Sequence, residues 1–210
     1  MLALSVLLTS VELISYNQNN YKSYQLKHNL SEAAGITQSE LDVVTSDLID
    51  YLKKGDNKLL EPHYNEREIA HMEDVYVLFL NGTIIRNICT VLLFILVGYT
   101  FYKYGILGSF RYMNFSMIGI WVISLMVFIL TLTSFSESFV KFHHIFFDND
   151  LWMLNPETDM MIRMLPEGFF NQLTIKIVVT YISMLLLVHL AVLIARRIFK
   201  KRGLRDDAKS

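Results

Sequence analysis

The stretch that decides the fold is YMNFSMIGIWVISLMVFILTLTSFS at residues 112–136, which contains no charged side chain. A helix needs about 20 mostly apolar residues to cross the hydrocarbon core of a bilayer, and this stretch meets that length. Residues 177–195 form a second uncharged run, in which His189 is the one ionisable group. A third run, 88–102, reaches the required length once its flanks at 84–103 are counted. Uncharged runs this long are rare in soluble domains, so the sequence predicts an integral membrane protein.

The N-terminal segment, MLALSVLLTSVELIS at residues 1–15, is apolar but is interrupted by Glu12. It lacks the basic start and the small-residue cleavage site of a signal peptide. We interpret it as a first transmembrane helix whose beginning is missing from this sequence, with a half-inserted segment as the alternative. The expected fold is therefore an all-α, four-transmembrane-helix bundle that forms a single integral membrane domain over 1–210. The predicted spans are approximately 1–15, 84–103, 112–135 and 173–195.

Basic residues set the expected orientation in the membrane. The tail RRIFKKRGLRDDAKS at 196–210 is rich in Lys and Arg, and the loop 103–111 carries a basic residue at each end. Because basic loops stay in the cytoplasm, we expect a multi-pass protein of the cell membrane with both termini cytoplasmic. Segments 16–83 and 136–172 are then two structured extracytoplasmic segments, and the active site should face outward.

The composition excludes several classes of function. Nineteen basic and twenty acidic residues give a net charge of −1, which argues against a nucleic-acid-binding protein. The single cysteine, Cys89, rules out a disulfide framework within the chain and any multi-cysteine metal site. It lies inside a predicted span, where a reactive thiolate is disfavoured. The chain also has no Gly-x-Ser-x-Gly elbow, phosphate-binding loop or HExxH motif, so chemistry driven by nucleotide hydrolysis is not expected.

Two amphipathic helices are predicted in the first outer segment, at 37–54 and 65–80. Each begins with a capping box, in which a polar side chain and a glutamate three residues later pair with free backbone N–H groups: Thr37 with Glu40, and Asn65 with Glu68. Each carries an apolar stripe at helical spacing: Leu41, Val44, Leu48 and Leu52 in the first, and Ile69, Met72, Tyr76 and Phe79 in the second. Gly55 is the expected C-cap of the first helix, which we interpret as a lid on the bundle or on the membrane surface.

His71 falls on the polar face of the second of these helices, with Arg67 one turn before it and Asp74 one turn after it. An isolated histidine on a helix is most simply a surface residue. Alternatively, Asp74 orients the imidazole while Arg67 opposes its protonation and keeps it a neutral base.

Residues 136–170, SESFVKFHHIFFDNDLWMLNPETDMMIRMLPEGFF, are rich in aromatic side chains of the kind found at membrane interfaces. The same stretch contains the ionisable residues His143, His144, Asp148, Asp150, Asp159 and Glu167. An aromatic belt does not explain adjacent histidines and four carboxylates, because ionisable groups held at membrane depth usually have a function. A short helix is expected to start at Asn155 and Pro156 and to end at Pro166.

Two kinds of chemistry fit these ionisable groups. Imidazole titrates near neutral pH, which suits general acid–base catalysis. A metal site would instead draw on His71, His143 and His144 with Asp148 or Asp150. Successive side chains on a helix diverge, so adjacent histidines are poorly placed to chelate one ion, and we favour acid–base catalysis with no metal.

Three motifs, EREIAHMEDV (66–75), FHHIFFDNDLW (142–152) and NPETDMMIRMLPEGFF (155–170), together resemble the bacterial lipoprotein intramolecular transacylases. These are integral membrane proteins of Gram-positive bacteria. The resemblance implies an acyltransferase that acts on a lipoprotein whose N-terminal cysteine carries a diacylglyceryl group. The sn-2 acyl chain moves to the α-amino group of that cysteine, which gives a lyso-form lipoprotein. The implied partners are this substrate and membrane lipid, with no nucleic acid and no cofactor, and we expect a monomer.

The resemblance also implies a catalytic pair, His71 in H-M-E-D and His143 in F-H-x-x-F-F, with His144 as the alternative register. We assign proton removal from the amine to His143, and proton traffic and stabilisation of the tetrahedral intermediate to His71. An oxyanion donor is expected among three residues: Trp152, Arg67 and Arg163. The candidate supporting groups are Asp74, Asp159 and Glu167.

Two other functions stay open at this stage. One is a membrane hydrolase of lipids or lipoproteins, with or without a metal, and loss of activity with a chelator would favour it. The other is a non-enzymatic binding protein, which would keep its function after replacement of both His71 and His143 by alanine.

Overall fold

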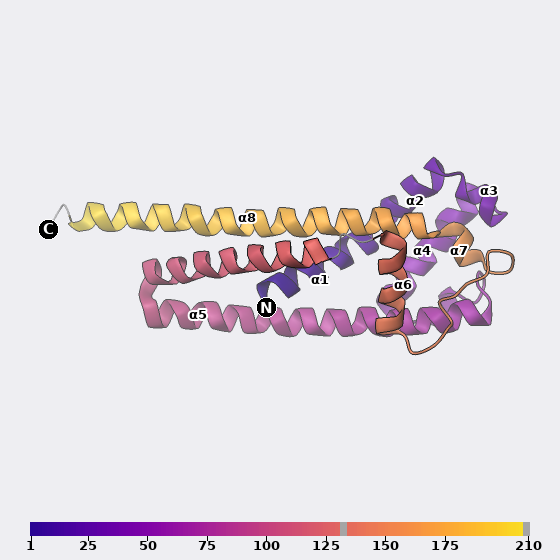
Figure 1. The fold of residues 1–210 in the computed structure, drawn as a ribbon, viewed down its shortest axis with the longest axis horizontal. Coiled ribbons are helices and arrows are strands. Elements are labelled where there is room, and N and C mark those ends of the chain that lie inside the picture. The colour runs from indigo at the N-terminus through magenta and orange to yellow at the C-terminus, as the bar shows by residue number, and fades with distance from the viewer. Residues whose placement is uncertain (131–133, 208–210) are drawn as a thin grey trace. The chain divides into compact units, whose positions relative to one another are not determined.

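The computed structural model describes residues 1–130 and 134–207, and every regular element in this part of the chain is a helix (Figure 1). Residues 131–133 of the predicted third span and residues 208–210 of the predicted tail lie outside the described residues. The chain divides into two compact units, whose boundaries fall within helices. Unit 1 comprises Met1–Leu8, Ile85–Leu132 and Val179–Ser210, and unit 2 comprises Thr9–Ile84 and Thr133–Val178.

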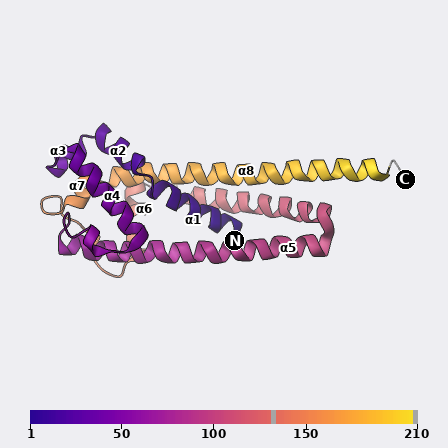
Figure 2. The same ribbon diagram turned by 180° about the vertical axis from the view of Figure 1, so that it is seen from behind.

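Unit 1 contains most of the two longest helices, α5 (Glu66–Leu130) and α8 (Glu167–Asp207). Helix α5 is broken at Gly105, whose φ of 65° and ψ of −177° are left-handed backbone values that favour glycine. The break divides α5 into two arms that run alongside each other in both ribbon views (Figures 1 and 2). The predicted span at 84–103 lies within the first arm, and residues 112–130 of the predicted span at 112–135 lie within the second. The predicted span at 173–195 lies within α8. The predicted loop at 103–111 is helical except at the break.

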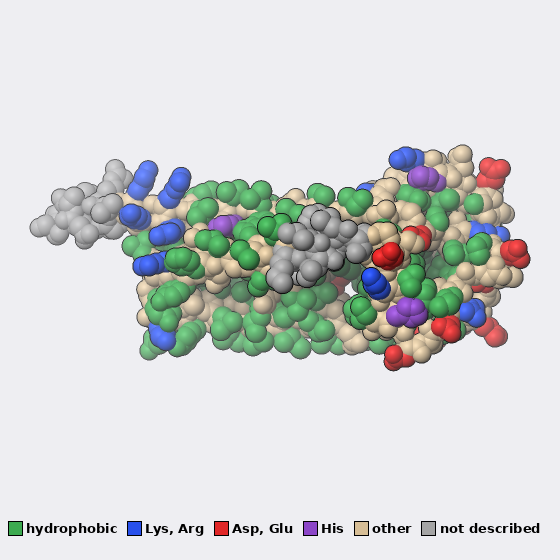
Figure 3. All heavy atoms as spheres, in the orientation of Figure 1, with side chains coloured by type: hydrophobic (Ala, Val, Ile, Leu, Met, Phe, Trp, Pro, Cys, Tyr) green, Lys and Arg blue, Asp and Glu red, His purple; other side chains and the backbone are tan. Residues whose placement is uncertain are grey.

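Both α5 and α8 are long and apolar enough to cross a membrane. In their most apolar windows, 0 % and 6 % of the residues are buried within the chain, whereas a core helix of a soluble protein would be mostly buried. The visible face of unit 1 is accordingly largely hydrophobic, with Lys and Arg side chains gathered where α8 ends (Figure 3). Exposure on this scale fits a surface surrounded by lipid.

Helix α1 (Leu2–Ser15) has only 14 residues, a length of about 21 Å at 1.5 Å per residue. Within unit 1 its first turns pack on the other helices: Val6 forms a small core with Met117 and Leu185. The Ser5 hydroxyl lies 2.6 Å from that of Thr90. This length is shorter than a bilayer core of about 30 Å, and the first span at 1–15 stays a prediction.

Unit 2 is a packed helical body that contains the first turns of α5 and α8. Its other helices are α2 (Gln18–Lys27), α3 (Leu30–Ala34), α4 (Gln38–Lys54), the 3₁₀ helix η1 (Asn57–Leu59), α6 (Phe135–Phe146) and α7 (Met160–Met164). The helix predicted at 37–54 is confirmed as α4, with its Thr37–Glu40 capping box and Gly55 as a left-handed C-cap. Its apolar stripe is buried in the core of unit 2.

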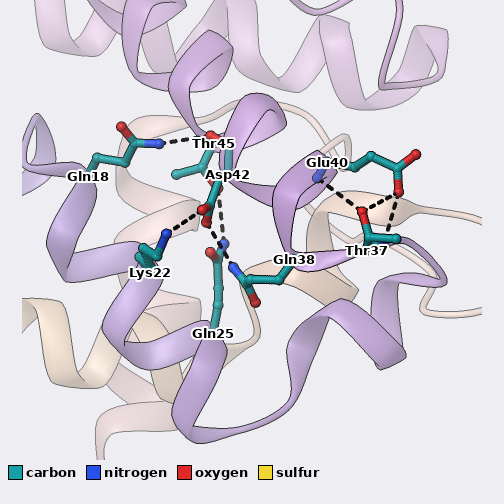
Figure 4. Close-up of polar contacts among 8 residues, drawn as sticks. All are labelled: Gln18, Lys22, Gln25, Thr37, Gln38, Glu40, Asp42 and Thr45. Carbon is teal, nitrogen blue, oxygen red and sulfur yellow. Dashed lines mark hydrogen bonds and ion pairs between the residues drawn. The ribbon is translucent and has the colours of Figure 1, made fainter.

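Polar contacts fix α2 against the outer edge of α4 (Figure 4). The Gln18 amide donates to the Asp42 carbonyl at 2.8 Å, and Lys22 forms an ion pair with the Asp42 carboxylate. Gln25, which is fully buried, donates to the Thr45 hydroxyl at 3.1 Å. These bonds and the buried stripe make α4 a structural helix of unit 2.

The helix predicted at 65–80 is confirmed as the start of α5. The Asn65 side chain accepts from the Glu68 N–H at 3.0 Å, and the Glu68 carboxylate accepts from the Asn65 N–H at 2.9 Å. The short helix predicted to end at Pro166 is confirmed as α7, but its predicted start at Asn155 and Pro156 is wrong. Asn155 begins a turn, in which its carbonyl accepts from the Asp159 N–H at 2.8 Å, and the helix starts only at Met160.

Candidate active site

His71 lies near the start of α5 and is buried, with 8 % of its side chain exposed. The simple interpretation of a surface histidine is therefore wrong. The polar face of α5 is covered here by α6 and the segment that follows it, since the ring of Phe147 meets the His71 ring edge-on at 5.5 Å. Local sequence could not reveal this cover, because it comes from a distant part of the chain.

His143 lies on the buried face of α6, and its ring centroid is 6.2 Å from that of His71. The His143 Nδ1 lies 2.7 Å from the carbonyl oxygen of Phe139. A carbonyl only accepts hydrogen bonds, so we assign the proton to Nδ1, which leaves the lone pair of neutral His143 on Nε2. His144 is exposed, and its ring lies perpendicular to the Trp152 ring with the centroids 5.3 Å apart. The structure thus brings His143, and not His144, next to His71.

Both imidazoles of the pair favour the neutral form. Burial, followed by the charge of a protonated His143, lowers the pKa of His71 to about 4, and the Asp74 carboxylate opposes part of the shift. Burial also lowers the pKa of His143, against the hydrogen bond to Phe139, which favours the charged form. Burial and the second histidine, rather than Arg67 as expected, keep His71 neutral. Near pH 7 the site therefore holds two neutral bases.

Aromatic rings enclose His143. The Phe139 ring lies 4.3 Å from it, Phe147 lies at 5.6 Å, and Trp152 stacks on it at 4.6 Å with an interplanar angle of 28°. Such a wall excludes water from around the imidazole, which explains the direction of its pKa shift. The aromatic belt expected from the sequence therefore includes side chains that form the wall of the histidine pair.

Two buried polar atoms at this site have no hydrogen-bond partner among the described residues: His71 Nδ1 and Trp152 Nε1. Only four buried side-chain atoms of the described chain are in this state, and two of them belong to rings next to His143. Buried polar atoms are normally satisfied, so such a concentration is typical of a site that receives a ligand.

Arg67 and Asp74 hold the loop that carries Trp152. The Arg67 guanidinium donates to the carbonyls of Asp150 at 2.6 Å and Met153 at 3.3 Å. The Asp74 carboxylate accepts from the Asn149 amide at 2.8 Å, and no hydrogen bond joins it to His71. The expectation that Asp74 orients the imidazole is not met. Both residues instead fasten the 149–153 loop across the face of α5 on which His71 lies.

A second pair of carboxylates fixes the start of α5 to α7. The Glu68 carboxylate, 1 % exposed, accepts from the Met161 N–H at 2.6 Å, a contact between residues 93 positions apart. Asp159 accepts from the Asn65 amide at 2.9 Å and from the Asn155 N–H at 2.7 Å. Burial opposes the charged form of Asp159, but these hydrogen bonds outweigh it and hold its pKa below the usual value. Sequence reasoning assigned Glu68 only a capping role and missed this connection.

The other candidate residues lie outside the histidine pair. Arg163 donates to the Asp159 carbonyl at 3.2 Å, and Glu167 accepts from the Ser136 hydroxyl at 3.3 Å. Asp148 and Asp150 are exposed. Within residues 1–130 and 134–207, no three side chains among His, Cys, Asp and Glu are grouped so that they could hold a metal ion.

Comparison with known proteins identifies the family. The model of the family described as lipoprotein intramolecular transacylase Lit matches residues 1–170. A solved structure of the membrane-integral lipoprotein intramolecular transacylase Lit from Bacillus cereus aligns with a TM-score of 0.79 and 25 % identity, over 96 % of this chain and 92 % of that one. No curated protein matches the chain significantly.

Two further structures of the Bacillus cereus protein carry one histidine replaced by arginine or by alanine. They cover 96 % of this chain and 88 % and 90 % of their own, with TM-scores of 0.72 and 0.71. Their identities, 24 % and 23 %, make them similar in fold. The family match extends over most of the chain and includes both histidines of the buried pair. The chain therefore belongs to the lipoprotein intramolecular transacylase (Lit) family, whose members are membrane-integral acyltransferases.

Proposed function

We propose that this protein moves the sn-2 acyl chain of a diacylglyceryl lipoprotein to the α-amino group of the same molecule's N-terminal cysteine. The observation that carries the proposal is the buried pair of neutral imidazoles, in which the bond from His143 Nδ1 to Phe139 leaves Nε2 free to accept a proton. An ester becomes an amide, a favourable exchange that needs no energy source. All residues of the pair come from one chain, so a monomer suffices.

The proposed step begins with the neutral amine, since an α-ammonium loses its proton at a pKa of about 7.7–8.0. The nitrogen attacks the sn-2 carbonyl carbon, a C–N bond forms, and the C=O electron pair moves to the oxygen. His143 Nε2 takes the proton released by the nitrogen. The C–O bond to glycerol then breaks, and the departing oxygen receives that proton. The products are one amide and one free glyceryl hydroxyl.

The described chain needs no protein nucleophile for this route. Amine and ester belong to one substrate, and well-oriented intramolecular reactions reach effective molarities of about 10⁵ M or more. His71, held neutral by burial beside His143, assists proton traffic and stabilises the tetrahedral intermediate. The phenylalanine wall around His143 keeps bulk water from competing with the amine.

We further propose that both units act as one integral membrane domain with four spans and two cytoplasmic termini, and with the histidine pair outside. Within unit 1, the rings of Phe110, just after the α5 break, and Phe199 stack at 5.7 Å. This contact supports placing the basic residues near the break and those at the end of α8 on the same side of the membrane. The positive-inside rule makes that side cytoplasmic.

The test is tandem mass spectrometry of a reporter lipoprotein's N-terminal lipopeptide, from a bacterium that makes only diacylglyceryl lipoproteins. With this protein expressed, one acyl chain should move to the amine at unchanged total mass. His143→Ala should abolish the transfer, because loss of a general base costs about 10²–10⁴ in rate. His28→Ala is the matched control, since His28 is an exposed histidine of the same unit, and its ring stacks on Tyr24 rather than on either histidine of the pair.

Each other outcome points to a different function. A mass lower by one acyl chain would identify a hydrolase, and inhibition by a chelator would make it metal-dependent. If transfer is lost in His144→Ala but retained in His143→Ala, the general base is His144 rather than His143. If the reporter lipopeptide is unchanged although this protein is well expressed, the non-enzymatic binding protein is the alternative that remains.

A further inference from the structure

The indole of Trp152 presents a hydrogen-bond donor that the described chain does not use. Its Nε1 is buried and has no partner, although the ring stacks on His143 at 4.6 Å. An indole N–H can only donate, so no change of tautomer or rotation of a hydroxyl relieves it. A buried donor without an acceptor destabilises the folded chain, and a ligand with an acceptor atom would relieve that cost.

The ring is held in place from several sides, which a site for charge stabilisation requires. It stacks on the His143 ring at 4.6 Å and makes a perpendicular contact with the His144 ring at 5.3 Å. Arg67 binds the carbonyls of Asp150 and Met153, on both sides of Trp152 in the chain. A donor fixed before the reaction stabilises a developing charge without reorganising during it.

The other two donors that the sequence suggested are directed at backbone carbonyls rather than at His143. Arg67 donates to two backbone carbonyls of the Trp152 loop, and Arg163 donates to the Asp159 carbonyl. The His143 Nδ1 proton is committed to Phe139. Among the three candidate oxyanion donors, Trp152 alone combines contact with His143 and an unused N–H.

We infer that Trp152 Nε1 donates a hydrogen bond to the sn-2 carbonyl oxygen and acts as the oxyanion donor of the transfer. This inference rests on the proposed function. The electron pair of the C=O bond moves to that oxygen as the amine attacks, and it returns when the glyceryl C–O bond breaks. The indole proton stays on nitrogen throughout, so Trp152 forms and breaks no covalent bond.

The test compares two tryptophan substitutions in purified, full-length protein with a diacylated lipopeptide. Trp152→Phe keeps an aromatic ring beside His143 and removes the N–H. Trp121→Phe is the matched control, because it makes the same chemical change in unit 1, where the Trp121 N–H already bonds to His189 at 3.1 Å. Removal of one oxyanion donor lowers kcat by about 10²–10³. We expect that loss in Trp152→Phe, with KM changed little, and less than about a threefold change in Trp121→Phe.

The outcomes separate this inference from the proposed function. If the unmodified protein transfers no acyl chain to the amine, the proposed function fails. If it does transfer the chain and Trp152→Phe works at a similar rate, Trp152 is not the donor. Should Trp152→Phe fail to fold, a second variant is used. In the Trp121→Phe chain, Trp152 is replaced by 3-benzothienylalanine, an isostere with sulfur in place of the indole N–H. The same loss of kcat is expected there, and an unchanged kcat would overturn the inference.

Discussion

Replacing Glu68 by glutamine should weaken the connection between α5 and α7 that supports the histidine pair. The Glu68 carboxylate is 1 % exposed and accepts from the N–H groups of Met161 and Asn65 at 2.6 and 2.9 Å. Glutamine keeps one accepting oxygen but turns an NH₂ toward the other N–H, which is left buried and unpaired. Hydrogen bonds to charged groups are worth about 1.5–3 kcal/mol, so we expect a loss of about 2–4 kcal/mol.

For a chain of this size, 1 kcal/mol corresponds to about 2–4 °C, so the unfolding midpoint should fall by roughly 5–15 °C. The measurement is thermal unfolding of the purified protein in detergent, followed by tryptophan fluorescence. Glu66→Gln is the matched control, because Glu66 is exposed in the same first turn of α5, and its midpoint should stay within about 2 °C. Equal midpoints for the two variants would refute the view that the Glu68 carboxylate carries the connection.

Three further predictions follow from the geometry of unit 2. The pKa of His71 in the folded chain, about 4, is below its usual 6.5, so the unfolded chain binds the proton more tightly and stability falls as pH drops below 6.5. Between pH 6.5 and 5 the free energy of unfolding should fall by about 1.6 kcal/mol through His71. The unfolding midpoint of His71→Gln should lack this part of the pH dependence, and an identical slope in both proteins would argue against a buried neutral imidazole. Gly35 and Gly55 both have positive φ, but a Cβ on Gly35 meets open space, whereas one on Gly55 would lie 2.5 Å from the Tyr76 ring. Gly35→Ala should therefore lower the free energy of unfolding, measured with denaturant, by about 1 kcal/mol, and Gly55→Ala should lower it by about 1–3 kcal/mol more. The reverse order would contradict the packing of α4 on α5. Arg67→Ala should free the Trp152 loop, with a red-shifted, more readily quenched Trp152 emission in the Trp121→Phe chain and transfer about 10–100-fold slower; unchanged emission would show that Arg67 does not position the loop.

Features set by neighbouring residues were predictable from the sequence. Uncharged runs gave the positions of the long apolar helices, because the requirement for about 20 apolar residues depends only on local composition. The caps of α4 and α5 followed from Thr37 with Glu40 and from Asn65 with Glu68, since a capping box closes within four residues. The apolar stripes of the same helices were also correct, because helical periodicity decides which residues share a face.

Predictions from neighbouring residues were wrong where groups from distant segments hydrogen-bond to the same atoms. Proline at position 156 favoured a helix start there, but the Asp159 carboxylate accepts from the Asn155 N–H and from the Asn65 amide of another segment. The start of the helix is thereby delayed to Met160. Asp74 looked like a partner for His71 because the two are neighbours on α5. The structure supplies Asn149 from the later segment, and its amide takes the carboxylate instead.

The sequence by itself determined the long apolar helices and the caps of α4 and α5. Through the motifs of the family it resembles, it also determined the identities of the two histidines. The tertiary structure alone decided that His71 is buried, that its partner is His143 and not His144, and that the Trp152 N–H has no acceptor within the described chain. The physical reason is that helix formation depends on residues within a few positions of one another. Burial, pKa and hydrogen-bond satisfaction depend instead on which distant segment covers a side chain.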